Sequence, residues 1–319
     1  MPLSKIQTGN MIDAKNLGRR NILINGAFQH WQRGTSFSSN VYGSDRWKLY
    51  APGGHAYAQS TDTPDSPDNF EFSASVGGSG DATGLTQFVE SKNAKHIPSS
   101  GSTKIILSFY LKHTTNSGTN KITSVVGTMD SADNTGASTN RSTKNHNTTT
   151  SYARYTHEMT GADLTTAVTN GLVVTIKHNG SGTTAFLLTG CQLEINETVT
   201  PFETRSFGEE LQLCSRYFQR YYGEQQEWIY NEANGTSNKW WQITFPHGTM
   251  RSAPSMTFSS GWTGGTAAGL GGTVSSMSCT TSKNRASCRV TMSATGGSSY
   301  NLHHCDSFNG DSCFMDAEL

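Results

Sequence analysis

Short apolar runs alternate along the chain with longer stretches of Gly, Ser, Thr and Asn. The clearest run, residues 104–112, has apolar side chains at every second position and therefore on one face of a strand. They are Ile105, Leu107, Phe109 and Leu111. Similar runs predict further strands at 21–28, 46–50, 70–76, 85–90, 121–128, 151–159, 172–178 and 185–194. Strands of this length, divided by turn residues, predict a β-sandwich of the jelly-roll type.

The range 116–150 departs from this pattern, because it consists almost wholly of Ser, Thr, Asn, Gly and Lys apart from an apolar run at 122–129. We expect long exposed loops on both sides of that run. Residues 1–20 are polar and show no sustained alternation, so they predict an N-terminal arm that becomes ordered only against another surface.

The pattern changes again after residue 205. Glu209 and Glu210 favour the N-terminus of a helix, and Leu211 and Cys214 follow at helical spacing, so a short helix is predicted over 209–217. Its apolar edge is small, and we expect neighbouring copies of the chain to supply the missing burial. Leu211, Cys214 and Tyr217 are the residues expected at that contact.

A second set of apolar runs begins beyond Tyr222, between Gly-rich turns. It predicts strands at 227–231, 239–245, 255–259, 272–278, 286–293 and 313–319. The predicted fold class is therefore all-β. Its parts are an arm (1–20), a jelly-roll domain (21–205), a helical linker (206–225) and a second, C-terminal β-sandwich (226–319).

The amino-acid composition disfavours several classes of function. Apolar residues make up 34% of the chain and charged residues 15%, with a formal net charge of zero. A chain without net charge, with its Lys and Arg scattered singly, has no field that attracts a polyanion, so nucleic-acid binding is disfavoured. No apolar run approaches 18 residues, and the first 18 residues lack the apolar core of a signal peptide, so we expect neither membrane insertion nor export.

Two phrases that begin 169 residues apart carry a resemblance to a known family. They are NILINGAFQHWQRGTSF at 21–37 and GCQLEINETVTPFETR at 190–205. They resemble the opening and closing segments of the carbohydrate-binding-module-like β-sandwich of bacteriophage tail fibres and other virion receptor-binding proteins. FGEELQLCSRYFQRYY at 207–222, FPHGTMRSAPSMTF at 245–258 and the terminal FMDAEL resemble the linker and tip domain of the same proteins.

The resemblance implies a virion location after assembly in the host cytoplasm, and a homotrimer that attaches through its N-terminal arm to other tail or head proteins. It implies non-catalytic binding of a host surface glycan, with many weak sites acting together. A structural fibre or decoration on the head is the alternative. A polysaccharide depolymerase is a further one, since glycoside hydrolysis needs only two facing carboxylates. No motif of another enzyme class is present, so we expect no catalytic residues and no cofactor.

Aromatic side chains are the first candidates for sugar contact, because C–H groups of a sugar pack on an aromatic ring. Tyr50 and Tyr57 flank a Pro-Gly-Gly loop, whereas Trp31 and Trp47 stand at positions expected in the core. Trp240 and Trp241 are adjacent on one predicted strand, so one of them must point away from the core, toward a neighbouring subunit or a ligand. Further ligand candidates are Trp262 and, in an expected loop tip at 298–309, His303 and His304.

Metal binding has weaker signals. Asp62, Asp65 and Asp68 share a loop, but two prolines interrupt it and no Gly pivot is present, which favours a solvated turn. A structural calcium is implied by the resemblance alone and has no assigned ligands. Four cysteines crowd the C-terminus: Cys279, Cys288, Cys305 and Cys313. Free thiols, disulfides formed after lysis and a zinc site with His303 or His304 all remain open for them.

Overall fold

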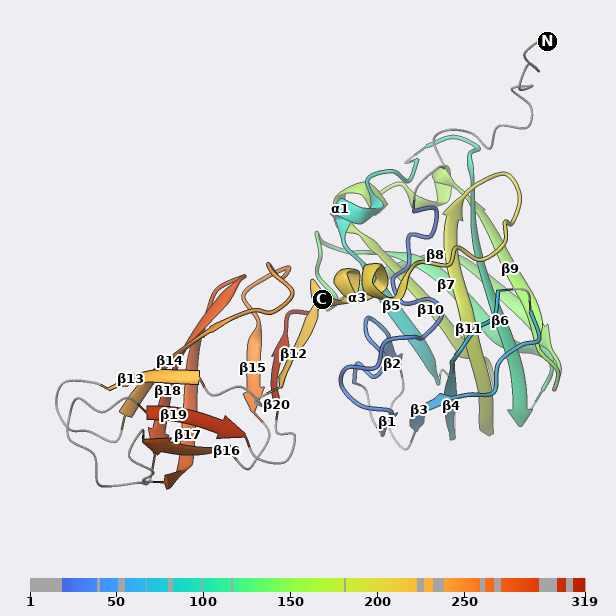
Figure 1. Cartoon of the computed structure of the whole chain (residues 1–319). Coiled ribbons are helices and arrows are strands. Elements are labelled where there is room, and N and C mark those ends of the chain that lie inside the picture. Colours follow the sequence, from blue (N-terminus) through green and yellow to red (C-terminus); the bar gives the residue numbers. More distant parts are fainter. Residues whose placement is uncertain are drawn as a thin grey trace, which may run out of the picture. The chain divides into compact units, whose positions relative to one another are not determined.

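We describe a computed structural model of the chain (Figure 1). It describes residues 19–38, 41–50, 55–66, 68–79, 83–98, 100–115, 117–180, 182–222, 227–231, 238–258, 262–266, 271–292, 303–307 and 312–318. Side chains are described in the same ranges except at 79, 222, 227–243, 258, 262–279, 287–307 and 312. The predicted arm, up to residue 18, lies outside these residues. The chain divides into two compact units, unit 1 up to Glu210 and unit 2 at Leu211–Glu318.

Unit 1 is a sandwich of two antiparallel sheets. The six-stranded sheet has the order β1-β3-β4-β11-β6-β9, and the five-stranded sheet the order β2-β5-β10-β7-β8. Their strands are β1 (Ser36–Phe37), β2 (Lys48–Tyr50), β3 (Ala56–Ser60), β4 (Ser73–Ser79), β5 (Gly84–Val89), β6 (Lys104–Thr115), β7 (Gly118–Met129), β8 (Ser138–Thr148), β9 (Ala153–Thr160), β10 (Leu172–His178) and β11 (Thr183–Ile195). Three short helical segments, α1 (Ser91–Ala94), η3 (Gly161–Leu164) and α2 (Ala167–Asn170), lie between strands.

The core of unit 1 forms where the apolar faces of the two sheets meet. The alternation predicted for 104–112 is confirmed, since Ile105, Leu107, Phe109 and Leu111 all lie in the one large buried cluster. The five-stranded sheet contributes Leu49, Leu85, Val126, Leu172, Val174 and Ile176 to the same cluster. Burying apolar side chains from both sheets is what holds the sandwich together.

Eight of the nine strands predicted in this range are present, and the one at 21–28 is not. That segment is irregular because Asn25 and Phe28 have φ angles of 55° and 54°, in the left-handed region that no strand can contain. The expectation of exposed loops on both sides of 122–129 is also wrong. Gly118–Met129 is a single strand, and Ser138–Thr148 forms the edge strand β8 beside it.

Unit 2 begins within helix α3 (Phe207–Ser215), close to the predicted 209–217. A three-stranded sheet follows, with the order β12-β20-β15, and six strands close into a barrel with the order β13-β14-β18-β17-β16-β19. The strands are β12 (Phe218–Tyr222), β13 (Glu227–Asn231), β14 (Asn238–Thr244), β15 (Ser255–Phe258), β16 (Trp262–Thr266), β17 (Gly271–Thr281), β18 (Arg285–Met292), β19 (His303–Ser307) and β20 (Ser312–Asp316).

The all-β fold class is therefore confirmed, while the second unit differs from the expected sandwich in one respect. Six of its described strands close into a barrel, and closure removes the unpaired edges that a sandwich of short polar strands would expose. The three-stranded sheet β12-β20-β15 stays open. None of the helices in the described part of the chain has the length and apolar character needed to cross a membrane.

Two of the three residues expected at a contact between copies are instead buried within a single chain. Cys214 and Tyr217 are completely buried in a single copy, so the expectation that neighbours are needed to cover them is wrong. Leu211 is partly exposed. Association in threes stays a prediction.

Candidate functional site

The two phrases that carried the family resemblance meet in space, at a junction formed by Asn21, Asn25, Arg205 and Glu210, here called the clasp. Asn21 donates through Nδ2 to the carbonyl oxygen of Cys191 at 3.0 Å and accepts from the amide of Leu193 at 3.1 Å. The start of the sandwich is thereby tied to its last strand, β11.

Arg205 completes the clasp from the other phrase. Its guanidinium donates to the carbonyl oxygens of Leu23, at 3.1 Å, and Asn21, and pairs with Glu210 at 3.3 Å. Glu210 also accepts from the amide of Asn25, whose own side chain donates to the carbonyl oxygens of His30 and Asp45. These hydrogen bonds pair the backbone amides and carbonyls of an irregular buried segment that belongs to no sheet. The role of both phrases is therefore structural.

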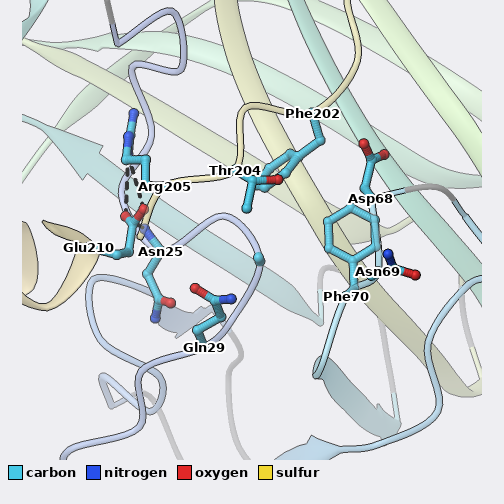
Figure 2. A pocket seen from close by; sticks show the side chains of 10 residues that line it. Asn25, Gln29, Asp68, Asn69, Phe70, Phe202, Thr204, Arg205 and Glu210 are labelled. Atoms are coloured by element: carbon cyan, nitrogen blue, oxygen red, sulfur yellow. Dashed lines mark hydrogen bonds and ion pairs between the residues drawn. The ribbon is translucent and has the colours of Figure 1, made fainter. Parts of the chain in front are cut away.

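A small pocket opens beside the clasp (Figure 2). Its volume is about 30 Å³, the space of a water molecule rather than of a sugar ring. Phe70 and Phe202 meet edge to face across it, with ring centroids 5.1 Å apart. Its two carboxylates are engaged, Glu210 by Arg205 and Asp68 by the hydroxyl of Tyr110 at 3.4 Å. This pocket offers no support for hydrolysis of a glycosidic bond.

The six-stranded sheet is covered on the side away from the core. Asp62 pairs with Lys112 there, Asp68 accepts from Tyr110, and the carbonyl of Thr200 accepts from Arg154. The acidic loop is thus partly held against the sheet, where we expected a solvated turn. No group of three or more His, Cys, Asp or Glu side chains among the described residues is arranged to bind a metal ion.

The five-stranded sheet offers a different surface. Its outer face, away from the core, carries two rows of residues that run across all five strands in register. The first row is Lys48, Thr86, Thr175, Val125 and Thr143. The second row is Tyr50, Gly84, Lys177, Thr123 and Asn145. Neighbouring members bond to one another: the hydroxyls of Thr86 and Thr175 lie 2.8 Å apart, and Thr123 donates to Asn145 at 2.7 Å.

Exposure on this outer face is greatest at its two edges. Tyr50 is 47% exposed at the β2 edge, and Thr143 and Asn145 are exposed at the β8 edge. The face therefore presents an aromatic ring, hydroxyl groups and an amide to solvent. These are the groups that contact the C–H faces and the hydroxyls of a sugar.

Two lysines lie over tyrosine rings at the β2 edge. The Lys177 ammonium is 5.8 Å from the centre of the Tyr50 ring, and that of Lys48 is 5.7 Å from the Tyr42 ring. Tyr42 pairs with Lys48 through an isolated bridge, so both side chains belong to the same face. We call Tyr42, Lys48, Tyr50 and Lys177 the lysine–tyrosine patch.

The structure separates the aromatic candidates of unit 1. Trp47 is buried in the core, where its indole donates to the carbonyl of Asn25, and Trp31 packs against that core, so both core predictions are confirmed. Tyr57 was expected to contact ligand, and this is wrong. Its side chain is 0% exposed, its hydroxyl bonds to Ser44, and burial raises its pKa far above the usual value. Tyr50 alone is exposed.

The candidates of unit 2 have described backbones but undescribed side chains. Trp240 and Trp241 lie on β14, opposite Arg289 and Cys288 of β18, and Trp262 begins β16. The loop expected at 298–309 is in part a strand, because His303 and His304 belong to β19. Ligand contact by these residues stays a prediction. Among the cysteines whose side chains are described, Cys191, Cys214 and Cys313 are buried, and Cys191 and Cys313 are free thiols.

Sequence reasoning missed Tyr42, Lys48 and Lys177. The alternation within the predicted strands 46–50 and 172–178 does place Lys48 beside Tyr50 and Thr175 beside Lys177 on faces opposite to the core. It could not show that these two strands share one sheet, separated only by β5.

Buried histidines form a second group of interest inside the sandwich. His157 bridges the two sheets, with its ring nitrogens 2.9 Å from the hydroxyls of Ser124 and Ser142, and His146 lies 2.8 Å from Ser124. Burial, with Lys144 nearby, lowers the pKa of each histidine to about 4. His113 lies farther along the sandwich, and burial beside His178 and Lys121 lowers its pKa to about 4 as well.

The fold and this polar face define the chain as an all-β protein with an exposed sheet surface. The comparisons with known proteins do not assign it to a narrower class. No family model matches the sequence, and no curated protein matches it. Solved structures with a similar fold include the CBM22-1 xylan-binding domain of Xyn10C from Paenibacillus barcinonensis. It is 12% identical over 56% of this chain and 96% of that domain, with a TM-score of 0.36.

A putative sugar binding protein from Bacteroides thetaiotaomicron is 10% identical over 55% of this chain and 100% of its own, with a TM-score of 0.38. The enzymatically active domain of tailspike protein 4 from bacteriophage CBA120 is 14% identical, with a TM-score of 0.35, and the match covers 56% of this chain but 22% of that one. Likeness at this level establishes neither common descent nor function.

Proposed function

We propose that this chain is a non-catalytic glycan-binding protein of a phage virion, a tail-fibre or tail-tip component that adsorbs to the host cell surface. The observation that carries the glycan-binding part is the outer face of the five-stranded sheet. Tyr50 stands exposed there beside hydroxyl and amide groups, on a sheet face that faces away from the core. A sugar ring stacks on Tyr50, and its hydroxyls exchange hydrogen bonds with the polar groups of the face.

The virion part of the proposal rests on the order of the motif phrases in the sequence. The N-terminal arm attaches the protein to other tail or head proteins, and three copies present their sites together. Immunogold labelling of intact particles tests this placement. Label on the tail supports adsorption, whereas label on the head favours the structural decoration instead.

The glycan-binding part is tested by Tyr50→Ala. Removing the ring takes away the stacking surface, so we expect binding to a host-surface glycan to weaken about tenfold, equivalent to about 1.4 kcal/mol. A glycan array identifies the ligand, and calorimetry with the soluble glycan measures the affinity of single sites.

Phe207→Ala is the matched control, because Phe207 is another exposed aromatic, 61% exposed, that lies on α3 and outside the outer face. We expect Phe207→Ala to leave the affinity for glycan unchanged. If Tyr50→Ala binds as tightly as the original protein and both remain folded, the outer face is not the binding site.

A further inference from the structure

The lysine–tyrosine patch points to the charge of the ligand. In the part of the chain that the structure describes, neither Lys48 nor Lys177 forms an ion pair. A third cation nearby, Arg33, lies 5.4 Å from the centre of the Tyr42 ring, but it is paired with Asp45 at 3.5 Å. Among the described residues, therefore, no carboxylate pairs with either lysine of the patch.

The two rows of the outer face contain no acidic residue. The ten residues of its two rows include two lysines and no Asp or Glu. The whole chain has a formal net charge of zero, so this face is locally more positive than the molecule as a whole. A local excess of one sign attracts a ligand of the opposite sign.

The backbone positions Lys177 over Tyr50. Gly84 stands between them in the second row, and a Cβ atom built there would lie 2.5 Å from the Cβ of Lys177. The absent side chain thus gives the lysine stem room to cross the row. The face of the Tyr50 ring attracts the ammonium, and this attraction holds the charge beside the ring.

The geometry points to an acidic glycan as the ligand of this face, an inference that rests on the glycan-binding function proposed above. One sugar stacks on the exposed part of Tyr50, and its anionic group pairs with Lys177. Residues two apart on a strand lie about 6.6–6.8 Å apart, so Lys48 stands roughly one sugar unit away from Tyr50 along β2 and pairs with a second anionic group.

The test is an array of acidic glycans, both carboxylated and sulfated, each beside its neutral counterpart made by carboxyl reduction or desulfation. We expect binding to the acidic member of a pair, falling as salt is raised. Lys177→Gln and Lys48→Gln each weaken that binding tenfold or more. Lys104→Gln is the matched control, because this lysine lies on β6 in the other sheet, paired with Glu158.

The outcomes separate the two proposals. Equal binding to both members of a pair, lost in Tyr50→Ala and kept in Lys177→Gln, overturns the acidic ligand and leaves glycan binding standing. Binding to no glycan by any form of the protein overturns both. Thermal denaturation checks that each lysine variant is folded, and Lys177→Arg, which keeps the charge, restores binding if the inference is correct.

Discussion

Arg205 is the single residue on which the clasp depends most. Its guanidinium serves two backbone carbonyls and the buried carboxylate of Glu210. We expect Arg205→Met to lower the free energy of unfolding by about 3–5 kcal/mol, because the substitution leaves a buried charge without its partner. Chemical denaturation of the full chain measures this.

Glu209→Gln is the control for this prediction, since Glu209 forms an exposed ion pair with Arg19. Exposed pairs contribute at most about 1 kcal/mol, so this variant stays close to the original stability. Equal stability of the two variants would show that the clasp does not hold unit 1 together.

Gly26 occupies a place in the first motif phrase that has no room for a side chain. A Cβ atom at this position would lie 2.1 Å from the carbonyl oxygen of Cys191 on β11. Gly26→Ala therefore forces the two segments apart and costs about 1–3 kcal/mol of stability.

Gly208→Ala adds the same methyl group where it meets nothing, within helix α3. Alanine favours the helix by about 0.5–1 kcal/mol, so a gain in melting temperature is expected there and a loss at Gly26. The same response at both positions would contradict the close approach of Gly26 to β11.

The histidines between the sheets give unit 1 a dependence on pH. His113, His146 and His157 have pKa values of about 4 when folded, whereas an unfolded histidine titrates near 6.5. The unfolded chain therefore binds more protons between these values, and stability, complete above pH 6.5, falls as the pH is lowered toward 4. Between pH 7 and pH 5 the loss is about 2 kcal/mol per histidine.

Urea denaturation at several pH values measures this slope. His157→Asn keeps a hydrogen-bonding side chain between Ser124 and Ser142 but removes one titrating group. We expect the free energy of unfolding of this variant to depend less steeply on pH, by the contribution of one histidine. A slope unchanged by the substitution would mean that His157 is not the group that binds protons on unfolding.

At the scale of elements, the sequence predicts strands well where burial imposes alternation, as at 104–112. It fails for β8, because Ser138–Thr148 has no large apolar side chain and becomes a strand only by pairing with β7. It fails at 21–28 for the opposite reason. That segment is apolar enough for a strand, yet the side chain of Asn25 and the distant Glu210 hold it in an irregular course.

The residues of the candidate site likewise differ in whether the sequence alone could indicate them. Tyr50 could be named from the sequence because it adjoins a Pro-Gly-Gly loop, but the same reasoning also names Tyr57, which is buried. Lys177, the neighbour of Tyr50, could not be named, since 127 positions separate the two in the sequence. Only the register of β2, β5 and β10 brings them together, and register is a property of the folded sheet.

At the scale of the whole molecule, the proposed function requires weak sites to act together. Three linked sites on a dense glycan surface are expected to bind about 10²–10⁴ times more tightly than one site binds the free glycan. Surface plasmon resonance at high and low glycan density measures the ratio, and sedimentation velocity measures the number of copies. A monomer that binds equally at both densities would contradict the trimer.

The clasp also has a consequence for how the domain can be transferred by recombination. Because Asn21 and Arg205 bond to one another, the chain enters and leaves the sandwich at a single point. A domain with adjoining ends can be grafted into a host polypeptide by recombination, with little strain at either seam. The sandwich is thus built as a cassette that recombination can move as a whole from one polypeptide to another.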